Sequence, residues 1–534
     1  MYNGHNYLGF TSTAEGNEKV KVFSTTNRDY LPEEFSLATE EEIEQATSKA
    51  KAAFEVYKKS SFEARAIFLE TIADEILSIG ETLIQRAMLE TGLPEARLIG
   101  ERGRTINQLK LFATLLREGS WVEAVIDPAL PDRKPLPRAD IRKMLYPVGP
   151  VVVFGASNFP FAFSTAGGDT ASALAAGCPV IVKAHSSHLG TNELVAKAIL
   201  AAAQKCDMPD GVFSSLIGEG AKLGQSLAKH GEVKAIGFTG SFRAGMALYK
   251  TAVNERKVPI PVYAEMSSIN PVVILPQMLE MEPAKTAAQL AASITLGVGQ
   301  FCTNPGLIFI IDGDAAEGFI QQLTEQLQQT TIATMLNQVI CKSYYSGREK
   351  IVTEKGVKTV YVGEDASSSF KGSAALMEVS AADFVANPDL QDEVFGPASL
   401  IIRCTDEAEL FSALVSLHGQ LTGTVYGIES DIRNFDRCID ALTEKVGRLI
   451  YNSVPTGVEV CHAMVHGGPF PATTDARTTS VGAEAIKRFV RPVCYQDCPE
   501  KFLPDALKNS NPLNLLRKVD GKYMRSPIAQ EQEV

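Results

Sequence analysis

A cysteine placed between glycines is the residue of this sequence best suited to act as a nucleophile. Cys302 stands in the run Gly299-Gln300-Phe301-Cys302-Thr303-Asn304-Pro305-Gly306, after the apolar, helix-like stretch 291–298. The glycines allow close approach of backbone and substrate, and Thr-Asn-Pro-Gly favours a turn, so we expect the thiol at a loop or helix end. Such positions expose the sulfur and can lower the pKa of the thiol. A lone cysteine is more often a small buried hydrophobe, so the rest of the chain must decide.

Two other polar residues follow apolar strands. Glu265 stands in Tyr263-Ala264-Glu265-Met266-Ser267-Ser268, and a buried carboxylate with a raised pKa can serve as a general base. Asn158, in Ser157-Asn158-Phe159-Pro160-Phe161, offers an amide donor for an oxyanion. Taken singly, the glutamate would more often be a half-exposed strand-end residue, and an asparagine in a turn usually caps its own backbone.

Two strand ends favour a dinucleotide. Lys183, in Ile181-Val182-Lys183-Ala184-His185-Ser186, comes just past an apolar strand, where α/β folds bind ligands. The run Gly237-Phe238-Thr239-Gly240-Ser241 combines a strand, a glycine turn and a helix start, which suits an approaching phosphate. It differs from the common Gly-x-Gly-x-x-Gly pattern. Without support, these would be a solvated lysine and a simple tight turn.

The elements that must position these residues alternate between strands and helices. Residues 39–117 have helical periodicity, a proline-rich run covers 127–138, and a β-rich stretch begins at Ile141. From 148 to 262, short apolar strands (151–154, 180–182, 212–217 and 235–238) alternate with helical patterns. A second α/β segment, with helices near 284–296 and 314–328, runs to about Ile450. This order predicts doubly wound parallel sheets buried on both faces.

Length and charge exclude several classes of protein. A chain of 534 residues needs two or three domains, and 45% hydrophobic with 21% charged residues is an ordinary globular balance. A formal net charge of -12 argues against a general nucleic-acid binder, although it leaves an anionic substrate possible. We expect no metal site.

Cysteine usage bears on the compartment. The 9 cysteines are odd in number and scattered, and residues 1–30 carry no leader-like apolar core, so we expect a protein of the reducing cytoplasm. Residues 144–168 are uncharged, but prolines and glycines interrupt them, so no membrane span is expected there.

The motifs together carry a family resemblance. In chain order these motifs resemble those of the aldehyde dehydrogenase superfamily, and the resemblance covers the chain from the helical lead-in to about Cys498. The residues that carry it are Asn158, Lys183, Gly240, Glu265, Cys302 and Glu393-Val394-Phe395-Gly396-Pro397. The resemblance implies a Rossmann-like cofactor domain (1–122 and 143–262), an α/β catalytic domain (263–469) and a β oligomerisation arm (123–142 and 470–498). A homo-oligomer, dimer or tetramer, is implied as well. The tail, 499–534, is expected to add little to either core.

The resemblance also implies roles. Cys302 would attack an aldehyde, Asn158 and the Cys302 backbone N–H would hold the oxyanion, and Glu265 would activate the water that releases the acid. Lys183 and Glu393 would contact ribose hydroxyls, Phe395 would lie beside the nicotinamide, and Gly240 and Ser241 would approach the cofactor.

The position of Ser186 favours NADP. Family members that prefer NAD often carry an acidic residue three positions after the strand-end lysine, where it repels a 2′-phosphate. Here that residue is Ser186, whose hydroxyl can donate to a phosphate. We therefore expect NADP to be accepted and preferred, with NAD not excluded.

Two departures from the common family pattern point to a subgroup. The runs 264–268 and 454–460, the latter leading to His466-Gly467-Gly468-Pro469, resemble the 2,5-dioxovalerate (2-oxoglutarate semialdehyde) dehydrogenases and the bacterial NADP-dependent fatty aldehyde dehydrogenases. A dicarboxylic semialdehyde needs a cation for its carboxylate, whereas a fatty aldehyde needs an apolar tunnel. By resemblance Arg104 faces the pocket and would clamp a carboxylate, which favours the oxo-acid.

Other interpretations stay open at this point. Phe159 and Phe163 would line the pocket for either substrate, and Arg104 is alternatively a solvated helix charge. His466 would bind or polarise the substrate, or be structural. An inactive relative would usually lose its nucleophile or base, and an enzyme that transfers the acyl group to coenzyme A often lacks the base, whereas this chain has both residues.

Overall fold

The first half of the chain builds an α/β layer whose central strands are parallel. The computed structural model describes residues 2–528. Its first sheet has the order β13-β12-β9-β10-β11-β1-β2, formed by β1 (Asn6–Leu8), β2 (Thr11–Thr13), β9 (Val151–Phe154), β10 (Val180–Lys183), β11 (Phe213–Leu216), β12 (Ala235–Thr239) and β13 (Val262–Glu265). Strands β9 to β13 run parallel to one another, while β1 joins β11 antiparallel. The continuous apolar runs of β9 to β13 are buried because helices cover both faces.

The helices of this half follow the predicted periodicity. They are α1 (Glu40–Tyr57), α2 (Phe62–Ser78), α3 (Glu81–Thr91), α4 (Glu95–Glu118), α5 (Gly168–Ala176), α6 (Leu189–Lys205), α7 (Gly220–Lys229) and α8 (Phe242–Asn254). A capping box between Thr39 and Glu42 begins α1. Short strands β3 (Lys19–Val20), β4 (Phe23–Ser24), β5 (Asp29–Tyr30) and β6 (Phe35–Ser36) form small ribbons near the N-terminus.

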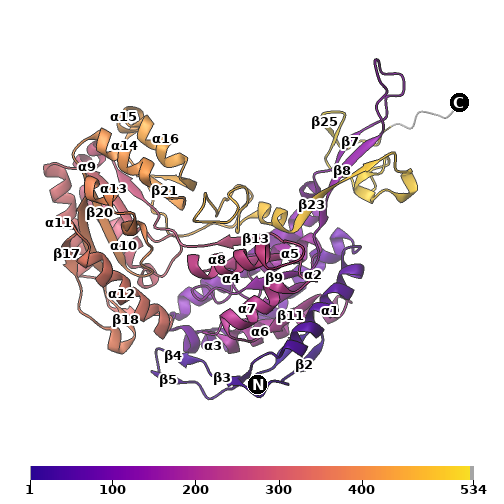
Figure 1. Cartoon of the computed structure of the whole chain (residues 1–534), viewed down its shortest axis with the longest axis horizontal. Coiled ribbons are helices and arrows are strands. Elements are labelled where there is room, and N and C mark those ends of the chain that lie inside the picture. Colours follow the sequence, from indigo (N-terminus) through magenta and orange to yellow (C-terminus); the bar gives the residue numbers. More distant parts are fainter. Residues whose placement is uncertain (1, 529–534) are drawn as a thin grey trace.

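The second half repeats the α/β plan on the other side of the molecule (Figure 1). Its sheet has the order β17-β19-β20-β15-β14-β21-β22, formed by β14 (Val272–Ile274), β15 (Leu307–Ile311), β17 (Lys358–Val362), β19 (Ala375–Ser380), β20 (Ala398–Cys404), β21 (Gln420–Tyr426) and β22 (Val446–Tyr451). Its helices are α9 (Pro276–Met281), α10 (Pro283–Thr295), α11 (Asp314–Gln328), α12 (Gln338–Thr353), α13 (Ala381–Ala386), α14 (Glu407–Ser416), α15 (Glu429–Asn434) and α16 (Asp436–Thr443), and a ribbon pairs β16 (Ala333–Thr334) with β18 (Lys371–Gly372).

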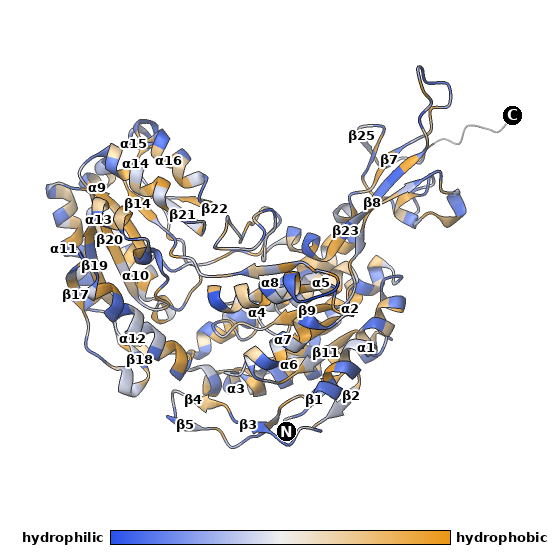
Figure 2. Ribbon diagram, in the orientation of Figure 1, coloured by the Kyte–Doolittle hydropathy of each residue, from blue (hydrophilic) through white to orange (hydrophobic). Residues whose placement is uncertain are grey.

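The strands of both sheets are predominantly hydrophobic in Figure 2, as expected for layers covered by helices. Within residues 2–528, helices long and apolar enough to cross a bilayer do not occur.

A third sheet forms an arm that projects from the first half (Figure 1). Its order is β23-β8-β7-β24-β25, with β7 (Val125–Asp127), β8 (Ile141–Pro147), β23 (Val490–Gln496), β24 (Arg517–Val519) and β25 (Lys522–Met524). Strand β8 pairs with β23 along its whole length, from Ile141 to Pro147. The arm therefore extends beyond residue 142, where the sequence led us to expect its boundary.

The tail beyond residue 498 corrects one expectation. It adds β24 and β25 to the arm sheet, and Leu507, Leu515 and Val519 are buried in the same core cluster as Phe112 and Trp121. The apolar residues of the tail are spaced too irregularly to predict a helix or a strand. They are nevertheless buried, because the tail packs against a sheet that the rest of the chain has formed. The tail therefore belongs to the core of the first half and to the arm.

Candidate active site

The carboxyl ends of the parallel strands gather the polar residues that the sequence singled out. Lys183, at the end of β10, is in register with Phe154 of β9, and Thr239 of β12 is in register with Glu265 of β13. Asn158 follows β9, and Gly240 follows β12 and donates its backbone N–H to the Glu265 carbonyl at 3.0 Å. This sheet edge is where open α/β folds bind ligands.

The loop that carries Cys302 comes from the other half of the molecule. After α10 the backbone turns through left-handed conformations, with φ of 55° at Gly297 and 65° at Gly299. A Cβ on Gly299 would lie 2.3 Å from the Gly396 carbonyl carbon, so only glycine fits. Cys302 is partly exposed in the turn that follows, as the sequence predicted.

Asn270 fixes this loop, and sequence reasoning missed it. Its side-chain amide donates to the carbonyls of Cys302 at 2.8 Å and Asn304 at 2.9 Å. Asn270 itself has a φ of 49°, a conformation that asparagine tolerates better than most residues. Its place just after the Glu265 motif was the available signal.

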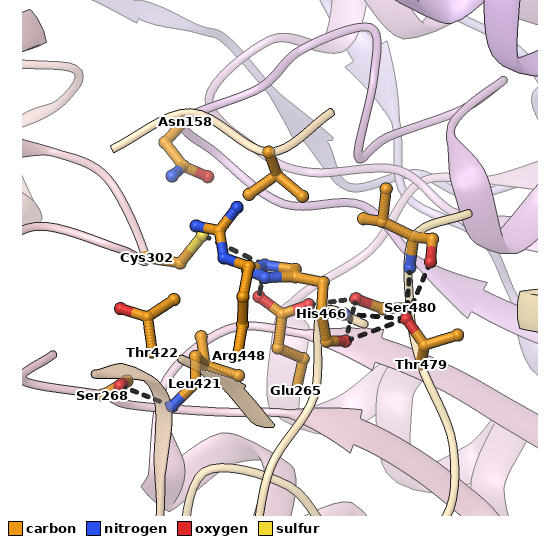
Figure 3. A network of polar contacts seen from close by, with 12 residues as sticks. Asn158, Glu265, Ser268, Cys302, Leu421, Thr422, Arg448, His466, Thr479 and Ser480 are labelled. Carbon is orange, nitrogen blue, oxygen red and sulfur yellow. Dashed lines mark hydrogen bonds and ion pairs between the residues drawn. The ribbon is translucent and has the colours of Figure 1, made fainter. Parts of the chain in front are cut away.

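A histidine brings the nucleophile and the glutamate together. The Nε2 atom of His466 lies 3.4 Å from Cys302 Sγ and 2.9 Å from Glu265 Oε1, and Figure 3 shows both contacts. The exposed fractions of Glu265 and His466 are 3% and 1%. His466, which the sequence assigned to substrate, thus lies between the candidate nucleophile and the candidate base.

The chain segment after β22 holds this arrangement. The His466 backbone N–H donates to Thr479 Oγ1 at 2.8 Å, and the Ser480 N–H donates to the His466 carbonyl at 2.8 Å. The Ser480 hydroxyl donates to Glu265 Oε2. Met266 N–H also donates to the Ala472 carbonyl at 2.7 Å. Residues 466–480 therefore lie directly against the end of β13.

The pKa values favour a protonated thiol beside an ionised glutamate. Burial raises the pKa of Cys302 well above its usual value, and the charges of Glu265 and Glu393 add to this, while Arg104 opposes it. Burial alone would raise the pKa of Glu265, but His466 and the Ser480 hydroxyl outweigh it and hold that pKa below its usual value. Cys302 therefore needs a proton acceptor before it can attack, and His466 Nε2 is within reach.

Asn158 lies against the nucleophile loop. Its side-chain amide donates to the Gln300 carbonyl at 3.1 Å. Buried Glu101 of α4 accepts the backbone N–H groups of Phe161 at 2.8 Å and Ala162 at 3.0 Å. Arg97 pairs with Glu101 at 2.7 Å and lies over the Phe159 ring at 4.3 Å. One ion pair on α4 thus holds the segment that presents Asn158.

We predict that Glu101→Gln slows the reaction by misplacing Asn158. The amide keeps its two backbone N–H bonds but loses the ion pair with Arg97, so kcat should fall roughly tenfold with little change in KM, as small misplacements of catalytic groups do. Steady-state kinetics measures this, with exposed Glu95→Gln on the same helix as the matched control. An unchanged kcat in a folded Glu101→Gln enzyme would remove Glu101 from the positioning role.

Comparison with known proteins decides the family. Residues 10–489 match the aldehyde dehydrogenase family. The chain belongs to this family. It is 54% identical over 488 residues to the Azospirillum brasilense protein named alpha-ketoglutaric semialdehyde dehydrogenase 2, covering 91% of this chain and 93% of that one. It is 46% identical over 522 residues to the alpha-ketoglutaric semialdehyde dehydrogenase of Acinetobacter baylyi, covering 97% and 98%.

Solved structures confirm the aldehyde dehydrogenase fold. Betaine aldehyde dehydrogenase from Staphylococcus aureus in complex with NAD+ superimposes with a TM-score of 0.78 at 20% identity, covering 93% of this chain and 96% of that one. The 1-pyrroline-5-carboxylate dehydrogenase from Thermus with bound NAD gives 0.76 at 20% identity, covering 92% of each. The predicted fold, with its two α/β halves and its arm, is therefore confirmed.

Arg104 of this aldehyde dehydrogenase points toward the same site. Its Nη1 donates to the Val458 carbonyl, while Nε and Nη2 are buried without a hydrogen-bond partner in the part of the chain described. The guanidinium lies 5.5 Å from the centre of the Phe163 ring, which in turn packs 6.2 Å from His466. Burial lowers the pKa of Arg104, and the nearby Cys302 raises it.

A second arginine, Arg448 of β22, was not singled out from the sequence. It donates to the Pro455 carbonyl at 2.7 Å and to the Gly457 carbonyl at 3.0 Å, so it holds the same loop as Arg104. Burial lowers its pKa, and Cys302 raises it; Figure 3 shows its guanidinium near Cys302 and His466.

Phe159 completes an aromatic wall beside these charges. Its ring centre lies 5.2 Å from that of Phe163 and 5.5 Å from that of Phe301. The dehydrogenase therefore offers both apolar surface and positive charge beside Cys302.

The residues expected to hold the dinucleotide lie at the same sheet edge. Lys183 is 6% exposed, and residues 2–528 give its ammonium no hydrogen bond or ion pair; burial lowers its pKa to about 8. A buried, unpaired cation fits a hydroxyl-rich or anionic ligand. Ser186 is exposed after β10, and Ser241 caps the N-terminus of α8 by accepting the Ala244 N–H at 3.4 Å.

Glu393 and Phe395 lie on the side of the nucleophile loop. They line one hollow together with Gly299 and Phe301. Burial raises the pKa of Glu393 to about 7, although hydrogen bonds from Ser267 and Ser268 oppose this. These side chains and Lys183 fit the nicotinamide dinucleotide that the family uses.

Proposed function

We propose that this aldehyde dehydrogenase oxidises 2-oxoglutarate semialdehyde to 2-oxoglutarate. The observation that carries the proposal is Arg104, a buried guanidinium beside Phe163 and Cys302, two of whose nitrogens have no hydrogen-bond partner among residues 2–528. A carboxylate satisfies such a group in a forked, charge-assisted pair. The names of the Azospirillum brasilense and Acinetobacter baylyi relatives support the same substrate.

Attack begins with removal of the thiol proton. Because the pKa of Cys302 is raised, the thiol proton passes from Sγ to His466 Nε2, which accepts it when the neutral imidazole carries its own proton on Nδ1. The charge that forms on the imidazole is stabilised by Glu265 at 2.9 Å. The sulfur then adds to the aldehyde carbon. Asn158 and the Cys302 backbone N–H stabilise the oxyanion, each worth roughly 3–4 kcal/mol of barrier.

Hydride loss turns the adduct into a thioester on Cys302. When bound, the nicotinamide supplies the hydride acceptor. Lys183, Glu393, Gly240 and Ser241 would hold that dinucleotide, with Phe395 beside its ring. The exposed Ser186 places no carboxylate where a 2′-phosphate would lie, which supports a preference for NADP over NAD.

Hydrolysis releases the acid. Glu265 accepts a proton from water as the water attacks the thioester carbon, and the thiolate leaves and is reprotonated. The ionised state of Glu265, held by its hydrogen bonds, suits this acceptor role. It also supports water, in preference to coenzyme A, as the acyl acceptor.

The arm supports a homo-oligomer. Strand β23 lies at one edge of the arm sheet. The backbone groups on the outer side of such an edge can pair with a strand of a second chain.

Replacing Arg104 tests the substrate. With 2-oxoglutarate semialdehyde, we expect Arg104→Leu to lower kcat/KM by roughly 100-fold, about 2–3 kcal/mol for a lost charged hydrogen bond. With a medium-chain aliphatic aldehyde the change should be small. Initial rates of reduced cofactor formation, taken with NAD and with NADP, measure both this and the cofactor preference.

Exposed Lys110→Leu on the same helix is the matched control and should leave both substrates unaffected. A wild-type preference for the aliphatic aldehyde would instead support a fatty aldehyde dehydrogenase, for which Phe159, Phe163 and Phe301 supply the apolar wall.

A further inference from the structure

We propose that Cys302, His466 and Glu265 also bind a zinc-class divalent cation that reversibly shuts off the enzyme. Their three ligand atoms lie within 4.8 Å of one another, and each side chain offers a different donor: sulfur, nitrogen and oxygen. Three protein ligands with one open position form the kind of set that holds Zn²⁺ in many enzymes. Nothing in the oxidation reaction requires this ion, so it would act as an inhibitor.

The spacing of the donors suits zinc. Zn–S of ~2.3 Å and Zn–N of ~2.0 Å at a tetrahedral angle place sulfur and nitrogen ~3.5 Å apart, and Cys302 Sγ lies 3.4 Å from His466 Nε2. The same construction places nitrogen and oxygen ~3.3 Å apart, against 2.9 Å between His466 and Glu265. Cys302 Sγ and the Glu265 oxygen lie within 4.8 Å of each other, whereas the same construction places sulfur and oxygen ~3.6 Å apart. The glutamate therefore needs to move toward the sulfur by up to about 1 Å when the ion binds.

A second, independent observation is that the cluster contains buried polar atoms without well-aligned hydrogen bonds. Within residues 2–528, Glu265 Oε1 accepts no well-aligned hydrogen bond, and neither does His466 Nδ1 take part in one. The single Nε2 position of His466 faces both the sulfur and the carboxylate. Both Glu265 and His466 are almost completely buried, with exposed fractions of 3% and 1%. Burying polar atoms without well-aligned hydrogen bonds is costly. The 2.9 Å contact with His466 gives Glu265 Oε1 no aligned donor, and a cation would bind this oxygen directly.

The donor chemistry selects the ion. Thiolate and imidazole favour Zn²⁺ and its analogues Co²⁺ and Cd²⁺, whereas Mg²⁺ and Ca²⁺ prefer oxygen ligands. On binding, the metal takes the place of the thiol proton, which is released to solvent. The sulfur lone pair is then engaged with the metal and does not attack an aldehyde. Inhibition and catalysis thus exclude one another at Cys302.

Direct metal binding tests the proposal without turnover. We expect the full-length enzyme, in chelator-free and thiol-free buffer, to take about one Zn²⁺ per chain from a chromophoric chelator. Bound Co²⁺ should show the absorption of thiolate-to-cobalt charge transfer. Cys302→Ser and His466→Phe should each weaken Zn²⁺ binding at least about 100-fold, and Cys494→Ser, which removes an exposed thiol, should not.

The activity arm uses the same samples. Zn²⁺ should inhibit the wild-type enzyme, a chelator should restore the rate, and Mg²⁺ should have no effect. Zinc retained at full affinity by Cys302→Ser and His466→Phe, or lost with Cys494→Ser, would overturn the proposal, as would no binding at all. Because these readouts need no particular aldehyde, they stand or fall separately from the choice of substrate.

Discussion

Cys302→Ala is expected to abolish aldehyde oxidation, lowering kcat by about five to six orders of magnitude, the scale seen when a covalent nucleophile is removed. No other group replaces the sulfur, because residues placed around it are a base, an amide donor and arginines. Formation of reduced cofactor from 2-oxoglutarate semialdehyde measures the loss. The variant should still bind the dinucleotide, since Lys183 and the N-terminus of α8 lie in the other half of the chain.

A control variant and a contradicting result complete this prediction. Cys494→Ser, far along the chain on the exposed arm strand β23, should retain wild-type activity. Turnover by folded Cys302→Ala at anything near the wild-type rate would mean that the reaction does not pass through a cysteine adduct.

Glu265→Gln is expected to stall the enzyme after hydride transfer. Glutamine cannot accept a proton from water, so hydrolysis of the thioester should slow by roughly 10²–10⁴-fold, while attack by Cys302 proceeds. Rapid mixing should then show a burst of reduced cofactor, about one per active site, followed by a slow steady rate. The wild-type enzyme, for which hydrolysis is catalysed, is the reference trace.

The shape of the trace separates two roles of Glu265. If the burst itself is as slow as the steady rate, the glutamate acts chiefly on the thiol through His466 at 2.9 Å. That result would contradict its assignment as the base for water.

The fold, and the placement of Asn158, Lys183 and Glu265 at the ends of strands, follow from local sequence patterns. Short apolar runs such as 151–154 and 180–182 become the buried parallel strands β9 and β10, because only strands covered on both faces tolerate such runs. The ends of parallel strands meet at one edge, so a motif placed after a strand predicts where its residue will lie. The glycines and the Thr-Asn-Pro-Gly run predict the turn that carries Cys302, whereas its role as nucleophile is implied only by the motifs taken together.

Contacts between segments far apart in the sequence cannot be predicted from such local patterns. His466 contacts Glu265 because residues 466–480 fold back onto β13, and nothing in its local sequence distinguishes a buried histidine from an exposed one. Ser480 and Asn270 act through side-chain hydrogen bonds to distant segments, and such bonds leave no periodic signal in the sequence. The tail strands β24 and β25 are three residues each, too short to be recognised without the sheet they join.

Intact-mass analysis of Glu265→Gln, mixed with 2-oxoglutarate semialdehyde and NADP and quenched after the burst, tests the account most directly. We expect the protein to gain the mass of one 2-oxoglutaryl group, located by peptide mapping on the peptide that contains Cys302. An unmodified Cys302 in a sample that has produced one equivalent of NADPH would contradict the proposed thioester mechanism.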